Sequence, residues 1–240
     1  SIISQTNDIC PADRKIYTLR DVTSTVASYP LICGSIMSKK IAEGIEGLVL
    51  DVKVGKGAFM KDLASARELA ESLVRVGSGA GLNVTALLTR MDEPLGRMVG
   101  NALEVREGID ILQGVGPIDT TELTLALGAE MLILGKIAEN SDQAREILSE
   151  KIKNGDALAK FQGLIEAQGG DGSVVDDPDK LPSAAAKTQI IAPNSGYISE
   201  IDAYGIGMAA TALGAGRARA EDTIDPAVGI ELMEKCGAYV

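Results

Sequence analysis

The most consequential absence from this sequence of 240 residues is histidine, of which there is none. Histidine is the side chain most often used for proton transfer near neutral pH and a frequent metal ligand. Any chemistry must therefore use lysine, arginine, serine, tyrosine or carboxylate side chains, or residues outside this chain. Tryptophan is also absent and aromatic residues make up only 3%, so the core has to be built from aliphatic residues and methionine.

Cysteine, positive charge and long apolar runs are scarce as well. Cys10, Cys33 and Cys236 are far apart and form no CxxC motif, which is typical of a reduced, cytoplasmic protein. The net charge of -11 shows none of the basic excess of a nucleic-acid-binding protein. No run reaches the ~18 apolar residues of a membrane span, and the first residues do not resemble a signal peptide. We therefore expect no nucleic-acid partner and no membrane partner.

The hydrophobic pattern that is present predicts an α/β fold. A helical region broken near Pro30 is followed by alternating apolar strands and amphipathic helices. The expected elements are helix 11–44, strand 47–54, helix 61–77, strand 82–89 and helix 99–112. This strand–helix–strand–helix order is typical of a parallel sheet. On the helix at 61–77, the residues expected to face the core are Ala66, Leu69, Ala70, Leu73 and Gly77.

In the second half of the chain the predicted structure changes twice, from helices to a linker and from the linker to short strands. Residues 120–168 predict three further helices, and the segment 169–183, rich in Gly, Asp and Pro, predicts a linker. Residues 188–204 predict short strands around a turn at 193–196. We expect three parts: residues 1–45 from a helical domain, 46–183 as an α/β domain, and 184–240 as the start of a β-rich domain. The chain begins with serine and stops where another strand is expected, so we expect a partial sequence, truncated at both ends.

One concentrated basic and polar cluster stands in the first helical region. Ser35 and Lys39 are four residues apart, which places them on one face of a helix. Arg20 precedes Pro30, and a helical hairpin would bring it opposite the other two. The three side chains would offer several hydrogen-bond donors and one hydroxyl to an anion or a planar ligand with carbonyl groups. From spacing alone, solvated surface charges are the more common explanation for such residues.

Two other features have weaker signals. The glycine-rich stretch 54–57 follows a strand, where α/β proteins place ligands, but it matches no phosphate-binding motif and an ordinary tight turn explains it. Glu104 and Glu107 follow a turn at 94–96, where carboxylate and carbonyl oxygens can bind a hard cation. On their spacing alone, a solvated helix face explains these two carboxylates better.

Longer motifs make the chain resemble the thymidine and pyrimidine-nucleoside phosphorylase family. The characteristic stretches are RDVT at 20–23, SIMSKK at 35–40 and DVKVGKGAFM at 51–60. The similarity continues through 94–112, DDPDKLP at 176–182, LGAGR at 213–217 and DTIDPAVG at 222–229. It covers essentially the whole chain. The resemblance implies a small helical domain, a large α/β domain and a C-terminal α+β, sandwich-like portion.

The resemblance also implies a set of site residues. By match with the family's motifs, Arg20, Ser35 and Lys39 hold the pyrimidine base and are the catalytic residues. Four more positions shape the substrate pocket: Tyr17, Val26, Ile32 and Phe59. A structural potassium ion would be bound by the backbone carbonyls of Leu95 and Met98 and the carboxylate of Glu107. No organic cofactor is expected, and phosphate is the co-substrate.

The reaction that the resemblance implies is reversible phosphorolysis of a pyrimidine nucleoside to free base and (deoxy)ribose 1-phosphate, catalysed by a cytoplasmic homodimer. Uridine and deoxyuridine join thymidine as expected substrates, because the C-terminal half looks more like the broad-specificity bacterial members. The family's Lys-His-Ser-Thr-Gly-Gly phosphate loop is not in this sequence. This leaves open an alternative: a non-catalytic remnant of the same fold that binds a pyrimidine or a partner chain. A phosphoribosyltransferase would need a diphosphate site, which the sequence does not offer.

Overall fold

The computed structural model describes residues 9–23, 25, 28–217, 219 and 221–240. Its contacts divide the chain into two compact units. The first unit comprises residues 1–55, 59–90 and 126–145, and the second comprises 56–58, 91–125 and 146–240. The mixture of helices and parallel strands confirms the α/β fold class. No helix in the described part of the chain is long and apolar enough to cross a membrane.

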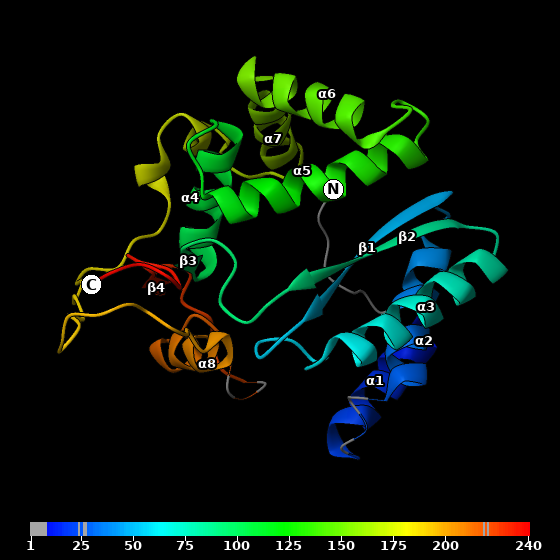
Figure 1. Ribbon diagram of the computed structural model, residues 1–240, viewed down its shortest axis with the longest axis horizontal. Helices are drawn as coiled ribbons and strands as arrows, with labels where there is room; N and C mark the ends of the chain where they lie inside the picture. The colour runs from blue at the N-terminus through cyan, green and yellow to red at the C-terminus, as the bar shows by residue number, and fades with distance from the viewer. Residues whose placement is uncertain (1–8, 24, 26–27, 218, 220) are drawn as a thin grey trace. The chain divides into compact units, whose positions relative to one another are not determined.

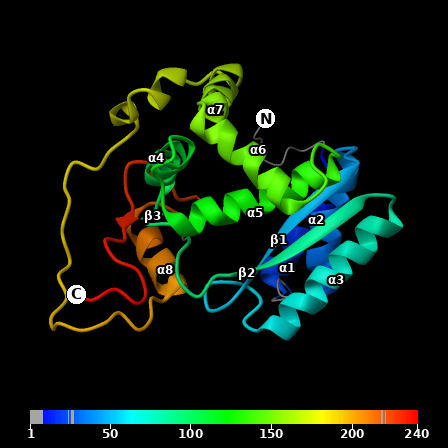
Figure 2. The ribbon, with the colours of Figure 1, turned by 45° about the horizontal axis from the view of Figure 1, so that its top comes forward.

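The first unit opens with two helices and a two-stranded parallel sheet. Helices α1 (Pro11–Val22) and α2 (Tyr29–Ala42) pack against each other, with a proline in the first turn of each. Strands β1 (Gly47–Val54) and β2 (Asn83–Arg90) pair in parallel from Gly47 opposite Asn83 to Val54 opposite Arg90. Helix α3 (Leu63–Gly79) connects them and contacts both strands and α2. Figure 2 shows α3 running along the β1–β2 pair.

The core of the first unit lies between α2, α3 and β1. Aliphatic side chains and methionine fill it, as the scarcity of aromatic residues requires; its largest fully buried members are Met37 and Leu73. All five residues predicted to line the inner face of α3 are buried. The break predicted near Pro30 is confirmed, with α2 beginning at Tyr29 because proline suits a first helical turn.

The second unit is organised around α4 (Asn101–Leu112), which packs against α7 (Asp156–Ala167) and a short antiparallel pair of β3 (Met98–Val99) and β4 (Ile230–Glu231). Two short 3₁₀ helices, η1 (Gly172–Val175) and η2 (Pro178–Lys180), follow α7, and α8 (Ala203–Leu213) contacts β3. Helices α5 (Ile118–Leu134) and α6 (Ser141–Lys153) contribute residues to both units. The three helices predicted within 120–168 are therefore confirmed.

Two predictions about the second half were wrong. Residues 188–202 form no strand apart from an isolated bridge between Tyr197 and Tyr239, and the segment runs as an extended path into α8 (Figure 1). A strand needs a neighbour, and the described residues supply one only at that bridge. The segment 169–183 is not a free linker either. Val175 is buried, and its carbonyl accepts a hydrogen bond from Gln113 at the end of α4. The domain boundaries drawn from the sequence stay predictions.

Candidate functional site

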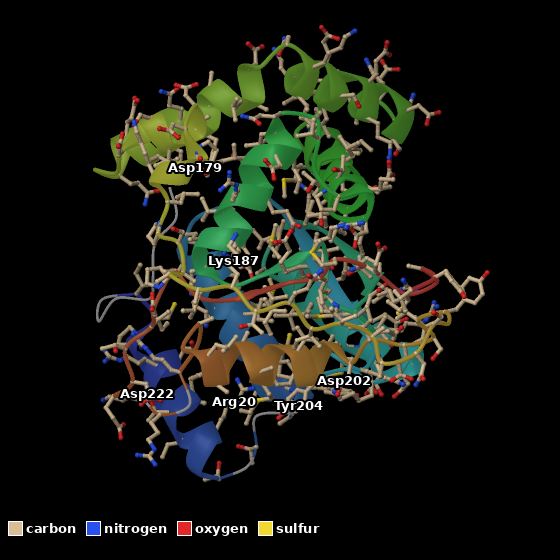
Figure 3. All side chains as sticks on the ribbon, turned by 90° about the vertical axis from the view of Figure 1, so that its left-hand side faces the viewer. Arg20, Asp179, Lys187, Asp202, Tyr204 and Asp222 are labelled. Atoms are coloured by element: carbon tan, nitrogen blue, oxygen red, sulfur yellow. The ribbon has the colours of Figure 1, made fainter. Side chains whose placement is uncertain are left out.

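The three basic and polar residues singled out by the sequence lie on the α1–α2 pair of the first unit. Arg20 is in the last turn of α1, where Figure 3 labels it, and Ser35 and Lys39 are on α2. Arg20 and Ser35 are not solvated surface groups, because they are only 4% and 7% exposed, and the Lys39 side chain is partly buried at 30% exposed. A buried guanidinium and a buried hydroxyl need polar partners, and the hairpin supplies one to Arg20 Nη1 and one to Ser35 Oγ.

Lys39 connects the cluster to a carboxylate. Its ammonium donates a hydrogen bond to Ser35 Oγ at 2.9 Å, which confirms that the spacing of four residues brings these side chains together. The same ammonium forms an ion pair with Asp13 Oδ2 at 2.7 Å. Asp13 lies in the first turn of α1, and its side chain is 7% exposed. The sequence interpretation did not assign Asp13 to the site, because its contact with Lys39 joins two residues that are 26 positions apart.

Arg20 reaches across the hairpin. Its Nη1 donates to the backbone carbonyl of Leu31 in the first turn of α2, at 3.3 Å. Its guanidinium carbon lies 5.3 Å from the ring centroid of Tyr17, one turn earlier on α1, in a cation–π arrangement. The guanidinium is therefore held from both helices, as a hairpin interpretation of the sequence requires.

The residues expected to shape the pocket have different environments. Tyr17 is 48% exposed beside Arg20, while Ile32 packs against the core of the first unit. Phe59 is 74% exposed and follows the loop after β1. An exposed aromatic ring of this kind is available to a ligand but shows no contact with the Arg20 cluster. Val26 lies outside the described residues.

The glycine-rich stretch after β1 behaves as a tight turn. The Lys56 N–H donates to Asp92, the Gly57 N–H donates to the carbonyl of Met91, and the Lys56 ammonium pairs with Glu200. A Cβ at Gly57 would lie 2.6 Å from the Cβ of Ala203, so only glycine fits there. These contacts within the second unit explain the glycines without a phosphate.

A second polar centre lies at the turn before α4. Glu107 is 7% exposed, and its Oε1 accepts hydrogen bonds from the backbone N–H groups of Arg97 at 2.7 Å and Met98 at 3.2 Å. Burial raises the pKa of this carboxyl, and the two backbone hydrogen bonds offset only part of that effect. No lysine or arginine among the described residues forms an ion pair with it.

A lysine from the C-terminal segment completes the same turn. The Lys235 ammonium donates to the carbonyls of Pro94 and of Gly96, the latter at 2.9 Å, and lies 3.2 Å from Asp119 Oδ2. Burial alone would raise the pKa of Asp119, but the Gly96 N–H and the Lys235 ammonium outweigh burial and lower it. Lys235 thus fixes two carbonyls on either side of Leu95, a role that the sequence did not signal.

The fit of a monovalent cation at this turn depends on Glu107. Its spacing favoured a solvated helix face, and that interpretation was wrong, because Glu107 is buried; the carboxylate of Glu104 instead accepts a hydrogen bond from the Gly100 N–H. A buried carboxylate without a positive side-chain partner among the described residues is the kind of oxygen ligand that a hard cation takes. Leu95 and Met98 lie on either side of Gly96 and Arg97, whose N–H groups bind Asp119 and Glu107. The residues present therefore fit a cation.

Two family models match the chain. Residues 1–158 match the model described as glycosyl transferase family, a/b domain. Residues 197–240 match the pyrimidine nucleoside phosphorylase C-terminal domain. The first match contains the whole Arg20–Ser35–Lys39 cluster and the turn at 94–98, whereas Lys235 belongs to the second.

Curated relatives match over the full 240 residues. The chain is 54% identical to a pyrimidine-nucleoside phosphorylase of Bacillus subtilis (strain 168). It is 51% identical to proteins of the same name from Staphylococcus epidermidis (strain ATCC 12228 / FDA PCI 1200) and Staphylococcus aureus (strain bovine RF122 / ET3-1). All of the chain is covered, but only 55% of each relative. The chain thus spans about half the length of these relatives.

Proposed function

The chain belongs to the glycosyl transferase family defined by the a/b-domain model, and from that membership we propose that it forms the base-binding part of a pyrimidine-nucleoside phosphorylase. The proposed reaction is reversible phosphorolysis of uridine, deoxyuridine and thymidine to free base and (deoxy)ribose 1-phosphate. Because the chain spans 55% of its relatives, the reaction is proposed for a protein of full family length that contains it.

The observation that carries the proposal is the hydrogen bond between Lys39 and Ser35, with Arg20 buried on the same helical hairpin. A pyrimidine that leaves C1′ takes negative charge into its ring nitrogens and carbonyl oxygens. Cationic and hydroxyl donors held in place before the reaction stabilise that charge where it develops. Burial of Arg20 and Ser35 strengthens such interactions, because little water competes for the donors.

Asp13, Arg20 and Lys39 together carry one net positive charge, counting one carboxylate, one guanidinium and one ammonium. That charge matches the single negative charge of a departing pyrimidine, so the site is suited to a leaving group that is neutral in the nucleoside and anionic after bond cleavage. Phosphate is the proposed nucleophile, and we assign no residue of this chain to it.

Three further features form part of the proposal. A potassium ion bound by the carbonyls of Leu95 and Met98 and by Glu107 would supply the positive charge that this carboxylate lacks. A homodimer joined through α1 is supported by Ile16 and Leu19, which are 48% and 59% exposed on that helix. The cytoplasmic location proposed for it rests on the three scattered cysteines. Replacing both with glutamate should shift a dimer to monomer in sedimentation velocity, and an unchanged sedimentation coefficient would argue against this interface.

The first test measures, by NMR titration, the affinity of the 240-residue chain for thymine and for uracil. We expect the Lys39→Met variant to lose affinity about tenfold or more, as for a hydrogen bond from a charged group. The matched control is Lys40→Met, because Lys40 is the next residue of α2 but pairs with exposed Glu43. Equal effects of the two substitutions would contradict the proposed site.

Turnover is tested separately. A chimera that joins this chain to the remaining part of the Bacillus subtilis relative should release base from uridine and thymidine in phosphate buffer, and Lys39→Met should abolish most of that release. Base binding by the chain with no release from a folded chimera would instead favour a non-catalytic pyrimidine-binding protein. The ratio of uridine to thymidine turnover measures how broad the specificity is.

A further inference from the structure

The buried carboxylate of Asp13 is the one charged group of the α1–α2 cluster that no sequence motif assigned. Its side chain is 7% exposed, and its Oδ2 lies 2.7 Å from the Lys39 ammonium. Among the described residues the ammonium is its only hydrogen-bonding or ion-pairing partner. A carboxylate is seldom buried without a compensating charge, so Asp13 and Lys39 depend on each other.

The geometry defines what Asp13 does to Lys39. A lysine side chain is a flexible chain of four carbons, and it loses considerable conformational freedom when its ammonium is held in one place. Asp13 on α1 and Ser35 on α2 grip the ammonium from two helices, at 2.7 Å and 2.9 Å. An ammonium has three N–H donors, and the described residues take up two of them. The Lys39 side chain is 30% exposed, so it is not sealed from a ligand, and the third donor has no partner among the described residues.

We propose that Asp13 is a positioning residue: its carboxylate fixes the Lys39 ammonium beside Ser35 so that the remaining N–H donor points to the pyrimidine. The inference rests on the proposed function, since the ligand is the base. It goes beyond that function by assigning the orientation of Lys39 to a residue that does not itself touch substrate. It also predicts that Lys39 no longer contributes to the affinity for the base when Asp13 is replaced by a neutral residue, even though Lys39 is still present.

The variants follow from the geometry. Asp13→Asn keeps the shape of the side chain but removes its charge, and Asp13→Glu keeps the charge on a longer stem. The matched control is Glu43→Gln, which neutralises the exposed carboxylate partner of the adjacent lysine, Lys40. Thermal unfolding of each variant identifies any that fails to fold. If Asp13→Asn fails to fold, the Asp13→Glu variant is compared with the unchanged chain in both measurements.

The first readout needs no ligand. The ¹⁵N signal of the Lys39 Nζ should be observable in the unchanged chain, because the ammonium is held in a partly buried ion pair. Asp13→Asn should shift or broaden that signal, Glu43→Gln should leave it unchanged, and Lys39→Met identifies it by its loss. An Nζ signal that is the same with and without the Asp13 carboxylate overturns the inference alone.

The second readout is the affinity of the same variants for thymine and uracil. Asp13→Asn should lower affinity about tenfold, Asp13→Glu should restore part of it, and Glu43→Gln should have no effect. The double variant Asp13→Asn/Lys39→Met should bind no more weakly than Lys39→Met, because Asp13 acts through Lys39. Additive losses, or unchanged affinity in Asp13→Asn, would overturn the positioning role. If the unchanged chain binds neither base, the proposed function fails, and the Nζ readout still reports on the ion pair.

Discussion

Asp13 and Glu107 are two carboxylates buried to nearly the same extent, 8% and 7% exposed, but their compensation differs. Asp13 faces an ammonium supplied by the neighbouring helix. Glu107 faces two backbone N–H groups and no positive side chain among the described residues. Burial raises the pKa of Glu107, so its charge is only partly compensated by its neighbours.

The difference shows how each site treats charge. At the α1–α2 hairpin the protein provides its own counter-ion, because Asp13 and Lys39 form an ion pair at 2.7 Å. At the turn before α4 the lysine, Lys235, donates to the carbonyls of Pro94 and Gly96 and pairs with Asp119, and it does not pair with Glu107. Either a bound proton or a diffusible cation can compensate the charge of Glu107, and we place the proposed potassium ion there.

Crowding the Glu107 carboxylate should have the largest effect on this comparison. Gly96 has φ +69°, and a Cβ there would lie 2.1 Å from Glu107 Oε2. Gly96→Ala should lower the free energy of unfolding by about 3 kcal/mol, the sum of left-handed strain and overpacking. Urea denaturation measures it. The control is Gly114→Ala, at φ +81° with no atom closer than 3.9 Å, which should cost only the strain, about 1–2 kcal/mol. Equal costs would mean that the Glu107 site tolerates the clash.

Removing the lysine of the second site should have an intermediate effect. Lys235→Met deletes an ammonium that is 21% exposed and bound by two carbonyls and Asp119. We expect a loss of about 2 kcal/mol, typical of hydrogen bonds to a charged group. Lys151→Met is the control, because the two side chains of its ion pair with Asp156 are 54% and 55% exposed, so solvent screens the pair and its loss should cost less than the loss of Lys235. If Lys235→Met lowered the free energy of unfolding less than Lys151→Met does, Lys235 would not be what stabilises this turn.

The two sites also differ in how much of each could be predicted from the sequence. The four-residue spacing of Ser35 and Lys39 is local, and helix geometry alone brings the two side chains together. The strands at 47–54 and 82–89 and the inner face of α3 were also predictable, because their apolar pattern is strong and short-range. Asp13, Lys235 and the burial of Val175 depend on contacts between residues far apart in the sequence, which periodicity does not encode. Strands were expected at 188–204 because local β-propensity says nothing about whether a partner strand is present.

The smallest predicted effect on stability is also the sharpest test of the comparison, and it concerns the charge of Glu107. A carboxyl whose pKa is raised by folding holds its proton more tightly in the folded state. The free energy of unfolding therefore falls as pH rises from the ordinary pKa of glutamate through the raised one, and the penalty is absent below that interval. Glu107→Gln cannot ionise, and its amide oxygen can still accept the two backbone hydrogen bonds. Without potassium, this variant should be at least as stable as the unchanged chain at neutral pH, by up to about 1 kcal/mol.

Potassium then separates the two carboxylates. Replacing choline chloride with potassium chloride at constant ionic strength should raise the melting temperature of the unchanged chain at neutral pH, because the ion binds only the folded state. The Asp13→Asn variant should show the same rise, because Lys39 already compensates Asp13. The Glu107→Gln variant should show none, and neither should the unchanged chain at a pH low enough to protonate Glu107. A potassium response that survives Glu107→Gln would mean that the cation binds elsewhere and that Glu107 is buried without compensation.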